Sequence, residues 1–203
     1  MVSNDLGTAG ICCAYLWMRI EMPSEMLAAC LWPDESLADR LLRLDHAGEN
    51  GAVSIYAGQM AVARWTAPAM LDDLARFQAD ERRHRALFAA ELQRRGLTRC
   101  KSFTICAVGG YMLGLVTGLL GRPAIAATTV AVEKVVLRHL ERQITVLSTS
   151  DAAAARTVSD IVAEETAHRD GFDAQRGSSL LLRPIQAIVS ASAELAIWLG
   201  MRL

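Results

Sequence analysis

Apolar residues recur every three to four positions through most of the chain, and no stretch alternates between apolar and polar residues as a strand does. Proline and glycine divide this pattern into helical lengths, because proline suits a first turn and glycine suits a helix end. We expect helices at about 34–65, 68–95, 123–147, 152–176 and 184–203. The Ser-Thr-Ser-Asp run at 148–151 should turn the chain and cap the helix after it. The chain is therefore predicted to be all-α.

One acidic pattern occurs twice in these helices. Each copy has a single glutamate and, 32 residues later, a Glu-x-x-His unit. The two copies are 84 residues apart and consist of Glu49, Glu81 and His84, and of Glu133, Glu165 and His168. On a helix, residues i and i+3 lie on one face about one turn apart. Each Glu-x-x-His unit can therefore bind one metal ion.

The residue types at these six positions suit a pair of iron or manganese ions. Carboxylates with one imidazole per ion favour these metals, whereas structural zinc prefers cysteine and histidine. Four carboxylates balance the charge of two divalent cations, which allows so many acids to be buried together. The single glutamates would each favour one ion and the other two could bridge, and two Fe(II) ions can give electrons to O2. Six such ligands on four helices predict a ferritin-like four-helix bundle.

The surroundings of the two single glutamates support this interpretation. Glu49 lies near Gly48 and Gly51, each of which costs roughly 1 kcal/mol relative to alanine inside a helix. Such a sequence suggests close packing around a site, and the alternative is a helix crossing that needs small residues. Glu133 lies in the apolar run ATTVAVEKVVL, where an unpaired carboxylate would be costly to bury.

Residues 103–120 carry no charge and are long enough to be a transmembrane candidate. A single crossing there would place the two copies of the acidic pattern on opposite sides of the bilayer, so the site could not assemble. The segment must therefore re-enter the membrane, lie in its interface or be buried in the core. Gly109 and Gly110 can break it into two arms, and Lys101 and Arg122 at its ends suit anionic head groups. We expect a hairpin that dips into one leaflet, and a pair of core helices is the other interpretation.

Composition limits the partners and the compartment. The 203 residues include 21 basic and 22 acidic ones, a balance that argues against nucleic acid as a partner. The five cysteines form no C-x-x-C pair, which indicates reduced thiols in the cytosol. Residues 1–33 are predicted to be a poorly ordered leader, and residues 34–203 one domain.

Four further residues are weaker candidates. His46 and His139 have no glutamate three residues earlier, and we expect them at the surface or in support of the ligands. Asp45, one turn before Glu49, could orient a ligand histidine. Tyr56 lies on the same helix face as Glu49 and about 10 Å further along the axis. Tyr56 could line a substrate channel, although core packing is the simpler role.

The strings around the six positions resemble those of the demethoxyubiquinone hydroxylase family, the di-iron monooxygenases of ubiquinone biosynthesis. The matching strings are LDHAGENGAVSIYAGQ (44–59), ERRH (81–84), TVAVEKVV (129–136) and EETAHRD (164–170). The resemblance covers roughly Ser36 to Leu203. It implies that the family's iron ligands are Glu49, Glu81, His84, Glu133, Glu165 and His168, with two iron ions, ferrous in the reduced state, as the cofactor.

The resemblance also implies a function and a place in the cell. The protein would use O2 to hydroxylate the ring of a polyprenyl demethoxyquinone or quinol, with no catalytic residue beyond the metal ligands. It would lie as a peripheral or monotopic protein on the cytoplasmic face of a bacterial inner membrane, as a homo-oligomer or with other ubiquinone-biosynthesis proteins. Many relatives have His-Tyr where this chain has His139-Leu140. A relay of electrons through that tyrosine is thus missing here.

Two other functions fit the same pattern of residues. The first is a ferritin-like iron storage or ferroxidase protein without an organic substrate, to which the charge-free segment would be of little use. The second is a non-catalytic membrane scaffold, which would hold no stoichiometric iron or manganese. The full prediction for the fold is a ferritin-like four-helix bundle with an additional hydrophobic, membrane-associating helical segment and a C-terminal helix.

Overall fold

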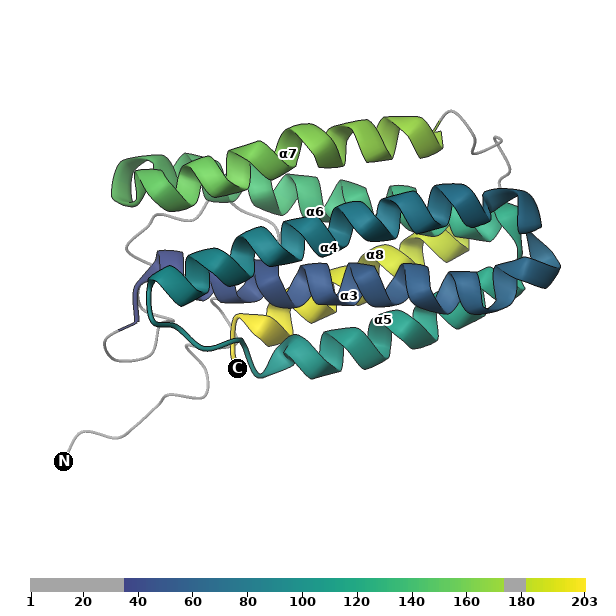
Figure 1. Cartoon of the computed structure of the whole chain (residues 1–203), viewed down its shortest axis with the longest axis horizontal. Helices are drawn as coiled ribbons and strands as arrows, with labels where there is room; N and C mark the ends of the chain where they lie inside the picture. The colour runs from purple at the N-terminus through teal and green to yellow at the C-terminus, as the bar shows by residue number, and fades with distance from the viewer. Residues whose placement is uncertain (1–34, 174–181) are drawn as a thin grey trace.

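The computed structural model describes residues 35–173 and 182–203, without the side chains of 167–168 and 171–173. This part of the chain contains six α-helices, one short 3-10 helix and no strand, so the prediction of an all-α fold is confirmed. The helices are α3 (Leu37–Thr66), η1 (Pro68–Met70), α4 (Leu71–Arg94), α5 (Ser102–Leu119), α6 (Arg122–Ser150), α7 (Ala152–Asp173) and α8 (Arg183–Gly200), as Figure 1 shows. The predicted leader at 1–33 lies outside the described residues.

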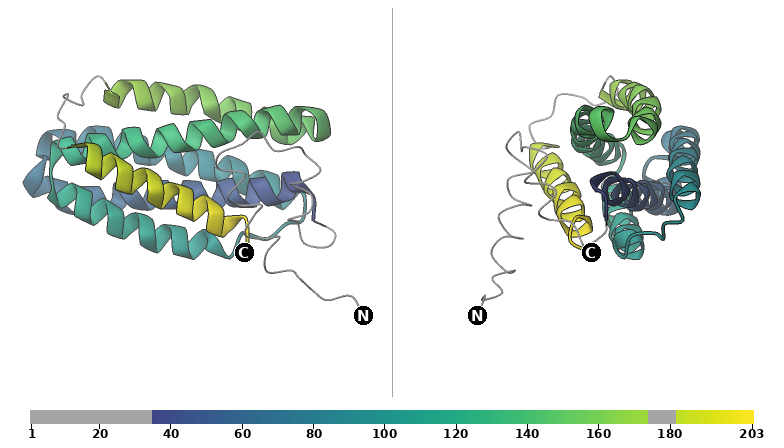
Figure 2. Two further views of the ribbon diagram at one scale, coloured as in Figure 1. Left: turned by 180° about the vertical axis from the view of Figure 1, so that it is seen from behind. Right: turned by 90° about the vertical axis from the view of Figure 1, so that its left-hand side faces the viewer.

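Four of these helices form the bundle and two flank it. α3 packs along α4, and α6 packs along α7, while α5 lies against α3 and α8 lies against α6. The end-on view in Figure 2 shows α5 and α8 outside the bundle, on the side turned away from α4 and α7. This is the ferritin-like arrangement with two additional helices that the sequence predicts.

The ends of the helices follow from local chemistry. Ser36 caps α3, since its Oγ accepts a hydrogen bond of 3.1 Å from the backbone N–H of Asp39. Asp151 caps α7 in the same way, by accepting a 3.0 Å bond from the N–H of Ala154. The turn between α6 and α7 is shorter than predicted, because α6 continues to Ser150 and only Asp151 separates the two helices.

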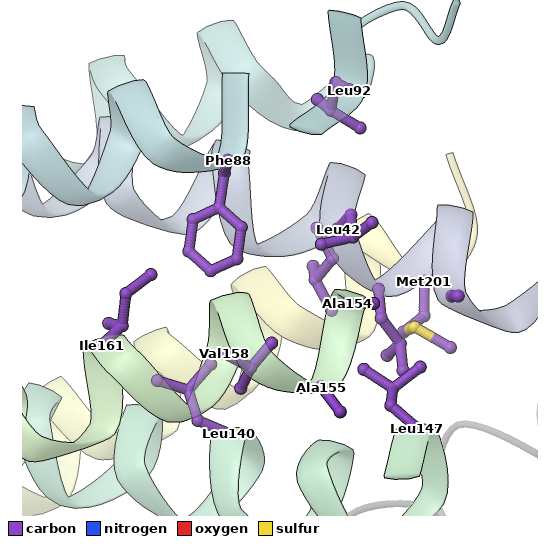
Figure 3. Packing of buried hydrophobic residues seen from close by; sticks show 13 residues of the cluster. Leu42, Phe88, Leu92, Leu140, Leu147, Ala154, Ala155, Val158, Ile161 and Met201 are labelled. Atoms are coloured by element: carbon purple, nitrogen blue, oxygen red, sulfur yellow. The ribbon is translucent and has the colours of Figure 1, made fainter. Parts of the chain in front are cut away.

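A hydrophobic core fills one end of the bundle, where α3, α4, α6 and α7 meet. Its largest side chains that are fully buried include Leu42 of α3, Phe88 of α4 and Ile161 of α7 (Figure 3). Met201, just after α8, joins the same cluster and so ties the end of the chain to the bundle. Burying a leucine or phenylalanine side chain stabilises a fold by about 1.5–3 kcal/mol.

Glycines bring α3 and α5 into close contact. A Cβ atom at Gly114 would overlap the carbonyl oxygen of Ile55, and one at Gly110 would overlap the backbone of Gly51. Gly51 therefore faces α5, with a Cβ position 3.4 Å from Cys106 Cβ, and Gly48 has nothing within 4 Å. Gly51 thus lies at the crossing of α3 and α5, but a Cβ atom there would make only ordinary contacts, so the close approach depends on Gly110 and Gly114.

The expected hairpin within residues 103–120 does not form. α5 is one continuous helix, and Gly110 contacts α3 instead of breaking the chain, so the prediction of two arms is wrong. A buried core helix is also excluded, because most residues of α5 are not buried. Among the described residues, α5 is the one helix long and apolar enough to cross a membrane by length and composition. Its exposed large apolar residues, which we call the outer face of α5, are Ile105, Val108, Tyr111, Met112, Val116 and Leu119.

Candidate metal centre

Four of the six predicted ligands meet inside the bundle. Glu49 comes from α3, Glu81 and His84 come from α4, and Glu165 comes from α7. One ligand atom from each of these residues lies within 4.8 Å of every other, and all four residues are buried. Helices distant in the sequence therefore bring three carboxylates and one imidazole to one point.

The fifth predicted ligand, Glu133 of α6, joins this cluster. Its side chain is buried, and the negative charge of Glu165 acts on it strongly enough to raise its pKa. The backbone of the sixth, His168, lies in α7 one turn after Glu165, but its side chain is outside the described part of the structure. Each of the four bundle helices thus contributes at least one residue of the predicted set.

The acids of this cluster are buried close together, and this alters their protonation. Burial raises the pKa of Glu49 well above its usual range, and the negative charges of Glu81 and Glu165 raise it further. The pKa of Glu133 is raised well above its usual range by burial and by the neighbouring Glu165. All these acids can ionise together only if positive charge lies among them. Two divalent cations would supply that charge, so the residues present fit a two-metal site.

His84 is held between two adjacent glutamates. Its Nδ1 atom lies 2.7 Å from Glu165 Oε1 and 4.0 Å from Glu81 Oε2, inside the acid cluster. Its Nε2 atom lies 2.9 Å from Glu164 Oε2, and the same oxygen contacts Arg83. Burial alone would lower the pKa of His84, but hydrogen bonds with Glu165 and Glu164 raise it to about 9.

Glu164 is not among the residues predicted from the sequence. A signal for it exists, because an acid directly precedes the glutamate of each Glu-x-x-His unit. These acids are Asp80 and Glu164, and they share the 84-residue spacing of the ligands. Each Glu-x-x-His unit of the repeat is thus preceded by one further acid.

The two remaining histidines are not at the surface. His46 is buried beside Phe103, with the ring centroids 4.8 Å apart. His139 is buried in α6, and its Nε2 atom lies 2.9 Å from Glu194 Oε2 of α8. Among their described contacts, His46 supports the packing of α5 on α3, and His139 ties α8 to α6.

Asp45 receives a hydrogen bond of 2.9 Å at Oδ1 from Gln143 Nε2 of α6. Burial raises the pKa of Asp45 to about 7, even though this hydrogen bond acts to lower it. The role of Asp45 in orienting a ligand histidine stays a prediction, because the side chain of His168 is not described.

A small cavity adjoins Glu133. It has a volume of about 10 Å³, room for roughly one water molecule. Its lining consists of Ala52, Ile55, Tyr56, Thr128, Thr129, Val132 and Glu133, from α3 and α6. Tyr56 therefore both lines a space next to an acid and packs in the core, where its ring stacks on Phe77 with centroids 6.2 Å apart.

Leu140, at the position where the resemblance implies a tyrosine, is buried in the hydrophobic core with Phe88 and Val158 (Figure 3). A leucine here adds apolar packing between α6, α4 and α7. The carboxylates and His84 meet without any contribution from this position.

Comparison with known proteins gives consistent matches over most of the chain. A model of the family described as "Ubiquinone biosynthesis protein COQ7" matches residues 36–200. An NADPH-dependent 3-demethoxyubiquinone 3-hydroxylase of Dictyostelium discoideum, described as mitochondrial, is 33% identical over 82% of this chain and 77% of its own length. A 3-demethoxyubiquinol 3-hydroxylase of Rhodospirillum rubrum is 33% identical over 82% and 79%. The human NADPH-dependent 3-demethoxyubiquinone 3-hydroxylase is 32% identical over 81% and 77%.

Proposed function

The chain belongs to the ubiquinone biosynthesis protein COQ7 family, and we propose that it is a di-iron monooxygenase that hydroxylates the ring of a polyprenyl demethoxyquinol. The reaction is the 3-demethoxyubiquinol 3-hydroxylation for which its relatives are named. The observation that carries the proposal is the buried cluster of glutamates and His84 at one point of a bundle matched almost end to end by the family.

We assign the metal ligands to the repeated pattern. The proposed ligands are Glu49, Glu81, His84, Glu133, Glu165 and His168. When bound, two ferrous ions supply electrons that activate O2. The protein's own part is to hold the carboxylates ionised around that charge, and to direct Nδ1 of His84 into the cluster. Since the cluster is buried, the surrounding helices also exclude bulk water from it.

The proposed hydroxylation requires an external electron donor. One atom of O2 enters the ring, and the other leaves as water, so each turnover needs two electrons and two protons from a donor. Relatives from Dictyostelium discoideum and human are named as NADPH-dependent. NADPH is therefore the first donor to test with this protein.

We place the protein on the cytoplasmic face of an inner membrane, with the outer face of α5 in the lipid. The exposed apolar residues of α5 support this placement, and α8, which touches α5, also exposes Ile188 and Leu195. Lys101 and Arg122 stand at the two ends of α5, where they would meet anionic head groups. The polyprenyl tail of the substrate would then stay in the bilayer.

Quinone analysis of cells tests the function directly. Cells that lack the protein should accumulate the demethoxy quinone and lose ubiquinone, as measured by mass spectrometry of lipid extracts. A plasmid carrying the wild-type chain should restore ubiquinone. Identical quinone profiles in deleted and wild-type cells would overturn the proposal. Iron storage without an organic substrate is not favoured, because the relatives are named as hydroxylases.

A further inference from the structure

Glu164 and Glu165 are neighbours in α7, but they have different surroundings. The side chain of Glu165 is 2% exposed and lies in the acid cluster, whereas that of Glu164 is 44% exposed. Glu164 nevertheless reaches a fully buried partner, because its Oε2 atom lies 2.9 Å from Nε2 of His84. One half-exposed carboxylate therefore contacts the far side of a candidate ligand.

The two ring nitrogens of His84 face different carboxylates. Nδ1 points to Glu165 at 2.7 Å, and Nε2 points to Glu164 at 2.9 Å. A histidine binds a metal through a nitrogen that carries no proton, and its other nitrogen then carries one. A proton on Nε2 that is donated to Glu164 leaves the lone pair of Nδ1 available inside the cluster. Glu164 cannot bind the same ion, because it lies against the opposite edge of the ring.

We propose that Glu164 is a positioning residue of the metal centre. Its carboxylate accepts the Nε2–H of His84 and holds the ring so that Nδ1 faces Glu81 and Glu165. This inference rests on the proposed function, because it requires that His84 binds a metal ion. Partners of this kind fix the proton and the orientation of ligand histidines, and their loss commonly weakens metal binding about 10–100-fold.

Arg83 pairs with Glu164 and with a second acid, Asp80. Arg83 Nη2 contacts Glu164 and also lies 3.0 Å from Asp80 Oδ1. Asp80 and Glu164 are the two acids that precede the glutamates of the repeated units. Arg83 thus joins equivalent positions of the two halves of the repeat through surface ion pairs.

A simpler role for Glu164 is a surface ion pair with Arg83, and the two roles predict different effects. The side chain of Arg83 is 46% exposed, and such pairs add about 0–1 kcal/mol to stability. If the ion pair were the whole role of Glu164, its loss would leave metal affinity unchanged. Arg83→Gln removes this ion pair without touching His84, so it serves as the matched control.

The test measures Co²⁺ affinity of the purified full chain by competition with a chelator, and the visible absorption of the bound cobalt. Glu164→Ala should weaken the tighter site about 10–100-fold and shift the cobalt spectrum. Glu164→Gln, which keeps an acceptor oxygen without the charge, should lose less. Arg83→Gln should stay within about threefold of wild type. Circular dichroism checks that each variant is folded. If Glu164→Ala does not fold, the comparison is made with Glu164→Gln.

Three results would overturn the inference. If wild type binds two ions and the folded Glu164 variants bind them as tightly, Glu164 does not position His84 and the proposed function stands. If Arg83→Gln loses as much affinity as Glu164→Ala, the ion pair and not the histidine contact is responsible. If wild type binds no stoichiometric metal, both the inference and the proposed function fail.

Discussion

At the scale of single residues, the acids of the metal centre are buried, and burial disfavours their negative charge unless cations are present. Glu49, Glu133 and Asp45 all have raised pKa values, and in each case burial is the largest cause. In the metal-free fold, ionisation of these carboxyl groups is therefore unfavourable. Metal binding would remove it, which links affinity for the ions to the stability of the bundle.

Removal of Glu133 should reduce metal content. Glu133→Ala takes away one buried carboxylate whose pKa is raised by the charge of Glu165, so we expect less than full occupancy of two ions and loss of hydroxylation. Metal analysis of anaerobically purified protein measures this. Glu141→Ala, at an exposed position of the same helix, is the control and should keep both ions. Full occupancy in Glu133→Ala would refute the ligand assignment.

The metal-free protein should lose stability as the pH rises. An acid whose folded pKa is raised stabilises the fold below its unfolded pKa, and this contribution disappears as the pH rises through the folded value. For Asp45 this interval runs from 3.8 to about 7, and the raised pKa values of Glu49 and Glu133 act in the same direction. His84, with its pKa raised to about 9, adds a loss of the same sign at higher pH.

Thermal unfolding with and without metal checks this pH dependence. The metal-free Tm should fall by several degrees between about pH 6 and pH 8, since about 1 kcal/mol corresponds to roughly 2–4 °C at this size. The metal-loaded protein should show a smaller fall. Glu133→Gln, which removes one buried acid, should raise the metal-free Tm at about pH 8. A metal-free Tm that rises over this interval would contradict the expectation.

At the scale of helices, α3 and α5 pack closely in the described part of the chain, because glycines lie where the two backbones face each other. At Gly58, Gly110 and Gly114, a Cβ atom would overlap the backbone of the other helix. The same helix α3 carries Glu49 on another side. The position of α5 and one metal ligand therefore depend on one helix.

Substitution of Gly114 should separate these two helices. Gly114→Ala would place a Cβ atom against the carbonyl oxygen of Ile55, which should reduce the free energy of unfolding by about 1–3 kcal/mol. Gly109→Ala is the control on the same helix, because nothing lies within 4 Å of its Cβ position. The control should gain up to about 1 kcal/mol from better helix propensity. Urea unfolding of both variants gives the comparison, and equal stability would show that α5 is not held by this contact.

At the scale of the whole molecule, the two additional helices give the bundle two different sides. α5 and α8 cover α3 and α6 and expose large apolar residues, while α4 and α7 lie on the other side (Figure 2). Surface salt bridges such as Arg76–Asp73 and Arg94–Glu91 occur on α4. The apolar side is the one that suits a lipid surface.

A charge on the outer face of α5 should weaken membrane binding and leave the metal centre intact. Val108→Asp combined with Val116→Asp should reduce binding to vesicles that contain anionic lipid at least about tenfold, because each apolar side chain contributes roughly 1.5–3 kcal/mol when buried. Leu87→Asp, at an exposed position of α4, is the control. Vesicle sedimentation measures binding. Unchanged sedimentation of the double variant would reject α5 as the membrane surface.

Features set by local chemistry could be predicted from the sequence, and features set by contacts between helices could not. Proline positions and the cap at Asp151 placed most helix ends within a few residues. Gly109-Gly110 was expected to break the apolar segment. Instead, α5 is continuous and Gly110 allows its backbone to approach α3 closely. Glu164 escaped notice because a half-exposed acid beside a ligand looks like part of a solvated surface. Only the structure shows that it reaches His84.

The glycine contact between α3 and α5 also fixes how far a substrate must travel. Helices in contact have axes about 8–10 Å apart, and small residues favour the short end of that range. With α5 on the bilayer, α5 and part of α3 lie between the lipid and the carboxylate of Glu49, which therefore stands more than one helix diameter above the lipid. An aromatic ring is shorter than that height, so it would rise together with the first units of its isoprenoid tail, while the rest of the tail stays among the acyl chains. The enzyme would then have no need to extract a whole lipid from the membrane, only to lift the ring and the start of its tail.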